Sequence, residues 1–160
     1  MDFNSCFDII GPVMVGPSSS HTAGVVSIGN FVHNLLGHYP EEASITFFDS
    51  FAATYHGHGT DKAIIGGLIG MKTDNLQIKN ALLIAKQAGL NYQLYLENHC
   101  EVYNHPNTTI ITATYQGETI KVGGVSLGGG VSKIFMINEE KVNVPLSISM
   151  INRKEEPIDD

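Results

Sequence analysis

The sequence is poor in basic residues and has no long basic segment. Nine Lys and Arg residues stand against sixteen Asp and Glu residues, which gives a formal net charge of −7. Nucleic-acid binding depends on Lys and Arg side chains that neutralise phosphates. We therefore expect no nucleic-acid partner.

Cysteine is also scarce. Cys6 and Cys100 are too few and too far apart for a disulfide framework, a zinc ribbon or the three or four thiolates of an iron–sulfur cluster. Neither has a basic neighbour in the sequence, so both are expected to pack as small apolar residues rather than to act as nucleophiles. If a metal takes part in the chemistry, most of its ligands come from elsewhere.

No apolar run approaches the roughly 20 residues that cross a membrane. Residues 1–15 include Asp2 and Asp8 and lack the basic start and cleavage site of a secretory signal. We expect a cytoplasmic protein with no membrane association. At 160 residues the chain suits one domain, and its charged, proline-interrupted end suggests a tail. We predict a domain over 1–148 and a tail over 149–160.

Hydrophobic periodicity predicts three helices and several strands. One helix begins near Ser20 and ends at Gly37, and a buried helix covers 61–72. A third helix follows a capping box made by Asp74 and Gln77 and ends at Gly89. Short β-branched or alternating segments predict strands at 44–50, 91–98, 107–115, 119–126, 133–138 and 141–146. This order predicts an α+β fold, with helices packed on a mixed, largely antiparallel sheet.

The glycine-rich segment "GGVSLGGGVSK" (123–133) does not fit a nucleotide-binding motif. It lacks Gly-Lys followed by Ser or Thr, and it lacks an ordered GxGxxG. A bent or bulged strand with close backbone approaches explains it better. A backbone nest for an anion remains open.

The segment "SSSHT" (18–22) places hydroxyls and an imidazole at a helix start. Unpaired backbone N–H groups and the helix dipole favour a bound carboxylate or phosphate there, within reach of His21. The simpler alternative is that one Ser caps the helix and His21 is a surface residue. Three serines exceed what a cap requires.

Two further segments place histidines beside small residues. In "YHGHGTD" (55–61), His56 and His58 point in opposite directions if the segment is extended, and Thr60 or Asp61 can cap the next helix. A zinc site on this segment lacks an evident third ligand. In "NHPN" (104–107), His105 precedes a proline and is expected to be extended. Its last residue either closes a turn or binds substrate.

The segments "FDIIGPVMVGPSSSHTAG", "SFAATYHGHGTDKAIIGGLIG" and "NHPN", in this order, resemble the β chain of the bacterial iron–sulfur-dependent L-serine dehydratases over roughly residues 1–148. The resemblance implies a lyase that converts L-serine to pyruvate and ammonia without pyridoxal phosphate (PLP). It implies a separate α chain whose cysteines hold a [4Fe–4S] cluster, no metal ligand in this chain, and a homodimer of this domain or an α2β2 assembly. It also implies a fold like the allosteric substrate-binding domain of some phosphoglycerate dehydrogenases.

The same resemblance assigns site residues. The candidate catalytic residues are His58, His21 and His105, with His58 preferred as the base for the Cα proton and His21 as the next choice. The candidate substrate-binding residues are Ser18, Ser19, Ser20, Thr22, Thr60 and Asn107, and Thr60 would orient His58. Many members of the family continue into an ACT-like domain, so we expect either that this chain is a fragment or that the ACT-like domain is absent. The alternative is a non-catalytic allosteric domain that binds L-serine or another anion, which predicts scattered histidines.

Overall fold

The computed structural model describes residue 16 and residues 18–147 of the chain. The predicted tail over 149–160, the domain boundary at 148 and Cys6 lie outside the described residues. In the part that is described, no helix is long and apolar enough to cross a membrane.

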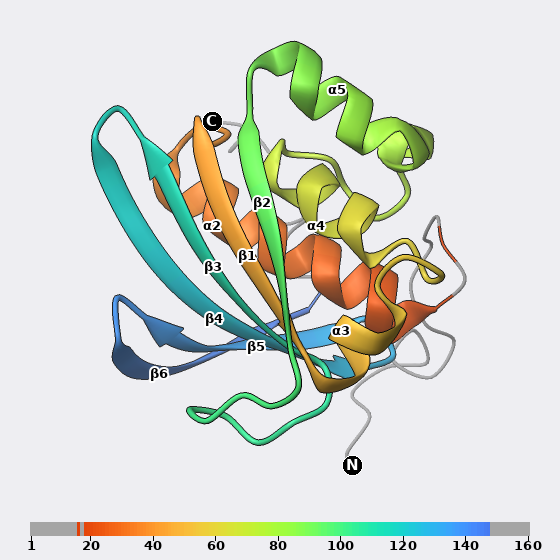
Figure 1. Cartoon of the computed structure of the whole chain (residues 1–160), viewed down its shortest axis with the longest axis vertical. Helices are drawn as coiled ribbons and strands as arrows, with labels where there is room; N and C mark the ends of the chain where they lie inside the picture. The colour runs from red at the N-terminus through yellow and green to blue at the C-terminus, as the bar shows by residue number, and fades with distance from the viewer. Residues whose placement is uncertain (1–15, 17, 148–160) are drawn as a thin grey trace, which may run out of the picture.

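A six-stranded mixed sheet forms the centre of the fold (Figure 1). Its strands are β1 (Glu42–Phe48), β2 (Asn91–Glu97), β3 (Thr108–Tyr115), β4 (Glu118–Gly128), β5 (Val131–Ile137) and β6 (Glu140–Leu146). Their order is β2-β1-β3-β4-β5-β6. Only the β1–β2 pair is parallel among the pairs described, and the other four are antiparallel. The predicted α+β fold is confirmed.

The helices lie together on one side of the sheet (Figure 1). They are the π-helical turn η1 (Ser19–Ala23), α2 (Gly24–Leu36), α3 (Asp49–Thr54), α4 (Thr60–Leu68), the 3-10 turn η2 (Leu76–Asn80) and α5 (Ala81–Ala88). Gly37 and Gly89 have φ values of 76° and 88° and end α2 and α5, as predicted. Glycine is suited to this left-handed position because it has no Cβ.

The structure corrects three of the predicted boundaries. The helix predicted over 61–72 begins at Thr60 but ends at Leu68. The predicted capping box is wrong, because the Asn75 side chain accepts the N–H of Gln77 at 2.8 Å and starts η2 instead. The strand predicted over 44–50 ends at Phe48, and its last two residues begin α3, which the periodicity did not predict.

The core fills the space between the sheet and the helices. Alternation along the strands turns every second side chain towards α2 and α4. The inward-facing sheet residues include Ala43, Ile45, Phe47, Ile111, Ala113 and Val122. The backbones of α2 and α4 approach closely at Gly29 and Gly67, where an added Cβ would meet backbone atoms of the opposite helix within 3 Å. The close approach at Gly29 and Gly67 fixes the position of the first turn of α2 relative to the first turn of α4.

The glycine-rich segment forms the irregular end of β4 and the turn into β5. The β4–β5 register shifts between Gly123 and Gly124, and again between Ser126 and Gly128. An added Cβ at Gly124 would clash with Ile28 of α2. The predicted bulged strand with close approaches is therefore confirmed, and the anion nest stays a prediction.

Candidate active site

His21 is buried in η1, with 8% of its surface exposed. Its Nδ1 lies 3.3 Å from the Ser18 Oγ and 3.0 Å from the Ser20 Oγ. The Ser18 Oγ also accepts the backbone N–H of His21 at 3.3 Å, which is the contact of a helix cap. Ser18 therefore caps η1, the turn that leads into α2, as the simpler interpretation expected of one serine. A surface position for His21 is ruled out because the next helices cover the ring.

The opposite edge of the His21 ring faces α3 and the turn that follows it. The His21 Nε2 lies 3.3 Å from the Ser50 Oγ. The rings of Phe51 and His58 meet the imidazole edge to face, with centroid distances of 5.1 Å and 4.7 Å. Burial lowers the pKa of His21, and the adjacent His58 lowers it further because two positive charges would repel each other there. His21 is therefore neutral at neutral pH.

His58 lies in the turn between α3 and α4, directly against His21. The segment is a turn rather than extended, so the expected alternation of His56 and His58 does not arise. The His58 Nδ1 and the Thr60 Oγ1 are both buried and have no hydrogen-bond partner among the described residues. The predicted orientation of His58 by Thr60 is therefore not supported by a hydrogen bond between these two atoms. The His56 side chain is 87% exposed, and its Nδ1 lies 3.9 Å from the Asp61 Oδ2.

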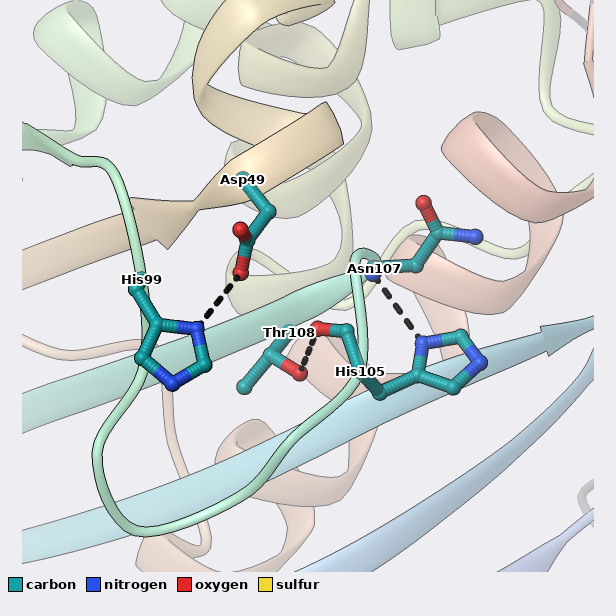
Figure 2. Close-up of polar contacts among 5 residues, drawn as sticks. All are labelled: Asp49, His99, His105, Asn107 and Thr108. Carbon is teal, nitrogen blue, oxygen red and sulfur yellow. Dashed lines mark hydrogen bonds and ion pairs between the residues drawn. The ribbon is translucent and has the colours of Figure 1, made fainter.

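His105 lies in the loop between β2 and β3 (Figure 2). Its Nδ1 accepts the backbone N–H of Asn107 at 3.0 Å, and its carbonyl accepts the Thr108 hydroxyl at 2.7 Å. Burial lowers the pKa of His105. The loop is thus folded back on itself, with Asn107 closing a turn, which was one of its two predicted roles.

The start of α3 connects this loop to His21. The backbone N–H groups of Ser50 and Phe51 donate to the Pro106 carbonyl at 3.0 Å and 3.4 Å. On the other side of the loop, the Ser126 N–H donates to the Asn107 carbonyl at 3.0 Å. Figure 2 also shows Asp49 facing His99, with Nδ1 and Oδ2 3.7 Å apart. The loop of His105 is therefore linked to the His21 network through Ser50.

Two sequence candidates remain, Thr22 and Ser19, and the structure adds one residue, Ser50. Thr22 is buried, and its Oγ1 has no hydrogen-bond partner in the part of the chain described. The side chain of Ser19 lies outside the described residues. Ser50 is a site residue that sequence reasoning missed. Its signal is a small hydroxyl residue two positions after the buried strand β1.

The described residues offer no group of three His, Cys, Asp or Glu side chains that could hold a metal ion. Cys100 is a free, buried thiol, as predicted. What the arrangement offers is two imidazoles in contact, one hydrogen-bonded at both nitrogens and one with a buried, unpartnered Nδ1. Such a pair can bind an anionic group and accept a proton.

A family model described as "Serine dehydratase beta chain" matches residues 5–133. The chain belongs to this family. It is 46% identical over 138 residues to the "Probable L-serine dehydratase, beta chain" of Bacillus subtilis, which covers 86% of this chain and 62% of that protein. It is 44% identical to the "L-serine dehydratase, beta chain" of Peptoniphilus asaccharolyticus, over 84% of this chain and 60% of that protein.

A shorter similarity connects the chain to proteins named without a chain designation. An "L-serine dehydratase" of Helicobacter pylori is 36% identical over 87 residues, which are 52% of this chain and 19% of that protein. The chain spans about three fifths of the length of the two beta-chain relatives. Their shared name implies a partner chain in a dehydratase.

The lowered pKa of His21 predicts that stability falls in mild acid. The folded-state pKa lies below the unfolded value of about 6.5, so the unfolded state binds more protons between these two values. The free energy of unfolding should therefore decrease as the pH falls below about 6.5 and level off below the folded-state pKa. Urea titrations from pH 8 to pH 5 would measure this slope.

His21→Gln and His56→Gln separate the buried group from a solvent-exposed one. The slope should be smaller in His21→Gln than in wild type, and His56→Gln is the comparison because it removes an exposed histidine. Equal slopes in all three proteins would show that His21 does not carry the pH dependence.

Proposed function

We propose that this chain is the β subunit of an L-serine dehydratase that deaminates L-serine to pyruvate and ammonia together with an α chain. Family membership supports the reaction class. The observation that carries the proposal is the contact between His21 of η1 and His58 of the turn before α4, whose ring centroids lie 4.7 Å apart. Scattered histidines would have favoured a non-catalytic domain that binds L-serine or another anion.

The reaction needs a base for the Cα proton of serine. His58 suits this step because its Nδ1 is buried and has no hydrogen-bond partner among the described residues. His21 has both nitrogens within hydrogen-bond distance of serine hydroxyls, so it suits binding and orientation rather than proton abstraction. We assign His58 as the base and His21 as the group that packs against it.

The remaining polar groups suit the substrate's charged ends. The hydroxyls of Thr22 and Thr60 are unpartnered within the described structure and can donate to a carboxylate. His105 and Asn107 lie in the loop bonded to the start of α3, from which they can close over the substrate. After the Cα proton and the hydroxyl leave, aminoacrylate remains and hydrolyses to pyruvate and ammonia through its imine.

The residues described here do not fit a cluster site, since the one described thiol is buried and no three ligands gather. In our proposal a [4Fe–4S] cluster is held by cysteines of the α chain. When bound it supplies a Lewis acid for the departing hydroxide. The roles assigned to this chain involve its own histidines and hydroxyls alone.

Anaerobic turnover of L-serine to pyruvate tests the proposal. The chain alone should be inactive, and addition of the α chain should give pyruvate without added PLP. Isothermal titration of the chain with L-serine provides the second measurement. Serine binding to the chain, with no turnover in the two-chain mixture, would contradict the proposal and support the non-catalytic domain.

A further inference from the structure

Ser50 lies at a sharp turn between β1 and α3. The preceding residue, Asp49, has a φ of 47°, a left-handed conformation that is unfavourable for a side-chain-bearing residue although Asp tolerates it better than most. Strained backbone of this kind is retained where the surrounding structure requires it, often at functional sites. Here the turn ends β1 abruptly and directs the Ser50 hydroxyl to His21.

The hydrogen-bond partners of Ser50 restrict its role. Among the described residues, the His21 Nε2 is the only hydrogen-bond partner of the Ser50 Oγ. Its backbone N–H donates to the Pro106 carbonyl, and its carbonyl accepts the Thr54 hydroxyl at 2.6 Å. The backbone of Ser50 is therefore fixed on both sides, and within the described part of the chain its hydroxyl hydrogen has one acceptor, the Nε2.

We propose that Ser50 is a positioning residue that holds neutral His21 in the tautomer with its proton on Nδ1. The Ser50 hydroxyl donates to Nε2, which must then be the unprotonated nitrogen. The Nδ1–H in turn donates to the Ser20 Oγ at 3.0 Å. Both tautomers can hydrogen-bond at both ring nitrogens, but only this one gives the Ser50 hydroxyl hydrogen an acceptor among the described residues.

The fixed tautomer has a consequence for the base. With both nitrogens engaged, the His21 ring is locked edge to face against His58. The His58 Nδ1 is then left free to accept a proton, because His21 offers it no competing donor. Ser50 also holds the loop of His105, through its backbone N–H, which donates to the Pro106 carbonyl. The effect on turnover rests on the proposed function, whereas the tautomer does not.

The tautomer is measured by imidazole ¹⁵N NMR on the uniformly labelled 160-residue chain at pH 8. Wild type should show His21 protonated at Nδ1. Ser50→Ala should shift the ring towards Nε2–H, because Nδ1 can then accept from Ser20, and Ser50→Thr should restore the wild-type pattern. Ser44→Ala, which removes an exposed hydroxyl of β1, is the control. An Nε2–H ring in wild type, or an unchanged ring in Ser50→Ala, would overturn the inference.

Turnover of the two-chain enzyme provides the second measurement. Ser50→Ala should lower kcat about ten-fold, the change expected from one lost neutral hydrogen bond, and should change KM less. Ser50→Thr should recover most of kcat. A tautomer shift without any serine turnover in wild type would sink the proposed function and keep the role of Ser50. Turnover that depends on His58, together with an unchanged His21 tautomer in Ser50→Ala, would keep the proposed function and overturn the role of Ser50.

Discussion

His58→Gln should lower kcat of the two-chain enzyme by about 100- to 10,000-fold, the usual contribution of a general base. Gln keeps a polar side chain of similar reach but cannot accept the Cα proton. The prediction follows from the buried Nδ1 of His58, which has no hydrogen-bond partner in the described chain and lies against His21. Initial rates of anaerobic pyruvate formation at saturating L-serine measure the effect.

His56→Gln is the matched control. It makes the same chemical change two residues earlier in the same turn, on a side chain that is 87% exposed. We expect nearly wild-type kcat and KM. Urea unfolding of both variants shows whether either loses stability. Nearly full turnover in His58→Gln would remove His58 as the base, and equal losses in both variants would assign the effect to the turn rather than to the imidazole.

Local sequence patterns predicted much of the fold because the signals are local. Gly37 ends α2 where a left-handed residue is needed, and the alternation over residues 91–95 of β2 follows from a sheet with one covered face. The hairpin of β3 and β4 required only two alternating segments around a short turn. These features depend on neighbours in the chain, so one sequence is sufficient to find them.

The parts that were missed depend on tertiary contacts. The start of α3 has a left-handed Asp49, which local propensity opposes, and the helix is held by backbone bonds to Pro106 in a distant loop. Asp74 and Asn75 are adjacent, and the side chain of either can cap a helix. The folded backbone places Asn75, not the predicted Asp74, where its side chain accepts the N–H of Gln77. Ser50 lies in α3, so it was missed because this helix depends on tertiary contacts that the local sequence does not show.

The candidate site shows the same division. The hydroxyl and histidine motifs identified His21 and His58, but nothing in their spacing shows that they touch. They meet because α2 and α4 cross closely, and that crossing depends on two glycines whose role appears only when both helices are in place. The contact between the imidazoles is therefore a property of helix packing.

Gly67→Ala should accordingly destabilise the chain by about 3 kcal/mol, at the upper end of the cost of overpacking a core. An added Cβ would lie 2.5 Å from the carbonyl oxygen of Val26 and 2.9 Å from the Cα of Gly29. Both are backbone atoms, so no side-chain rotation can relieve the clash and the helices must separate. Urea unfolding at pH 8 measures the loss.

Gly66→Ala provides an internal control at the neighbouring position. Its Cβ would make ordinary contacts of 3.5 to 3.6 Å with Ile78, Met71 and Ala81. Alanine also favours the helix, so this variant should be neutral or up to about 1 kcal/mol more stable than wild type. Equal stability of the two variants would show that α2 and α4 are not in backbone contact.

The same pair of variants connects packing to catalysis. Separation of α2 from α4 moves His21 away from His58, so Gly67→Ala should lose turnover even under conditions where it is fully folded. Gly66→Ala should retain it, because its side chain points towards η2 and α5 rather than α2. If folded Gly67→Ala kept full activity, the contact between the two imidazoles would not be needed for the reaction.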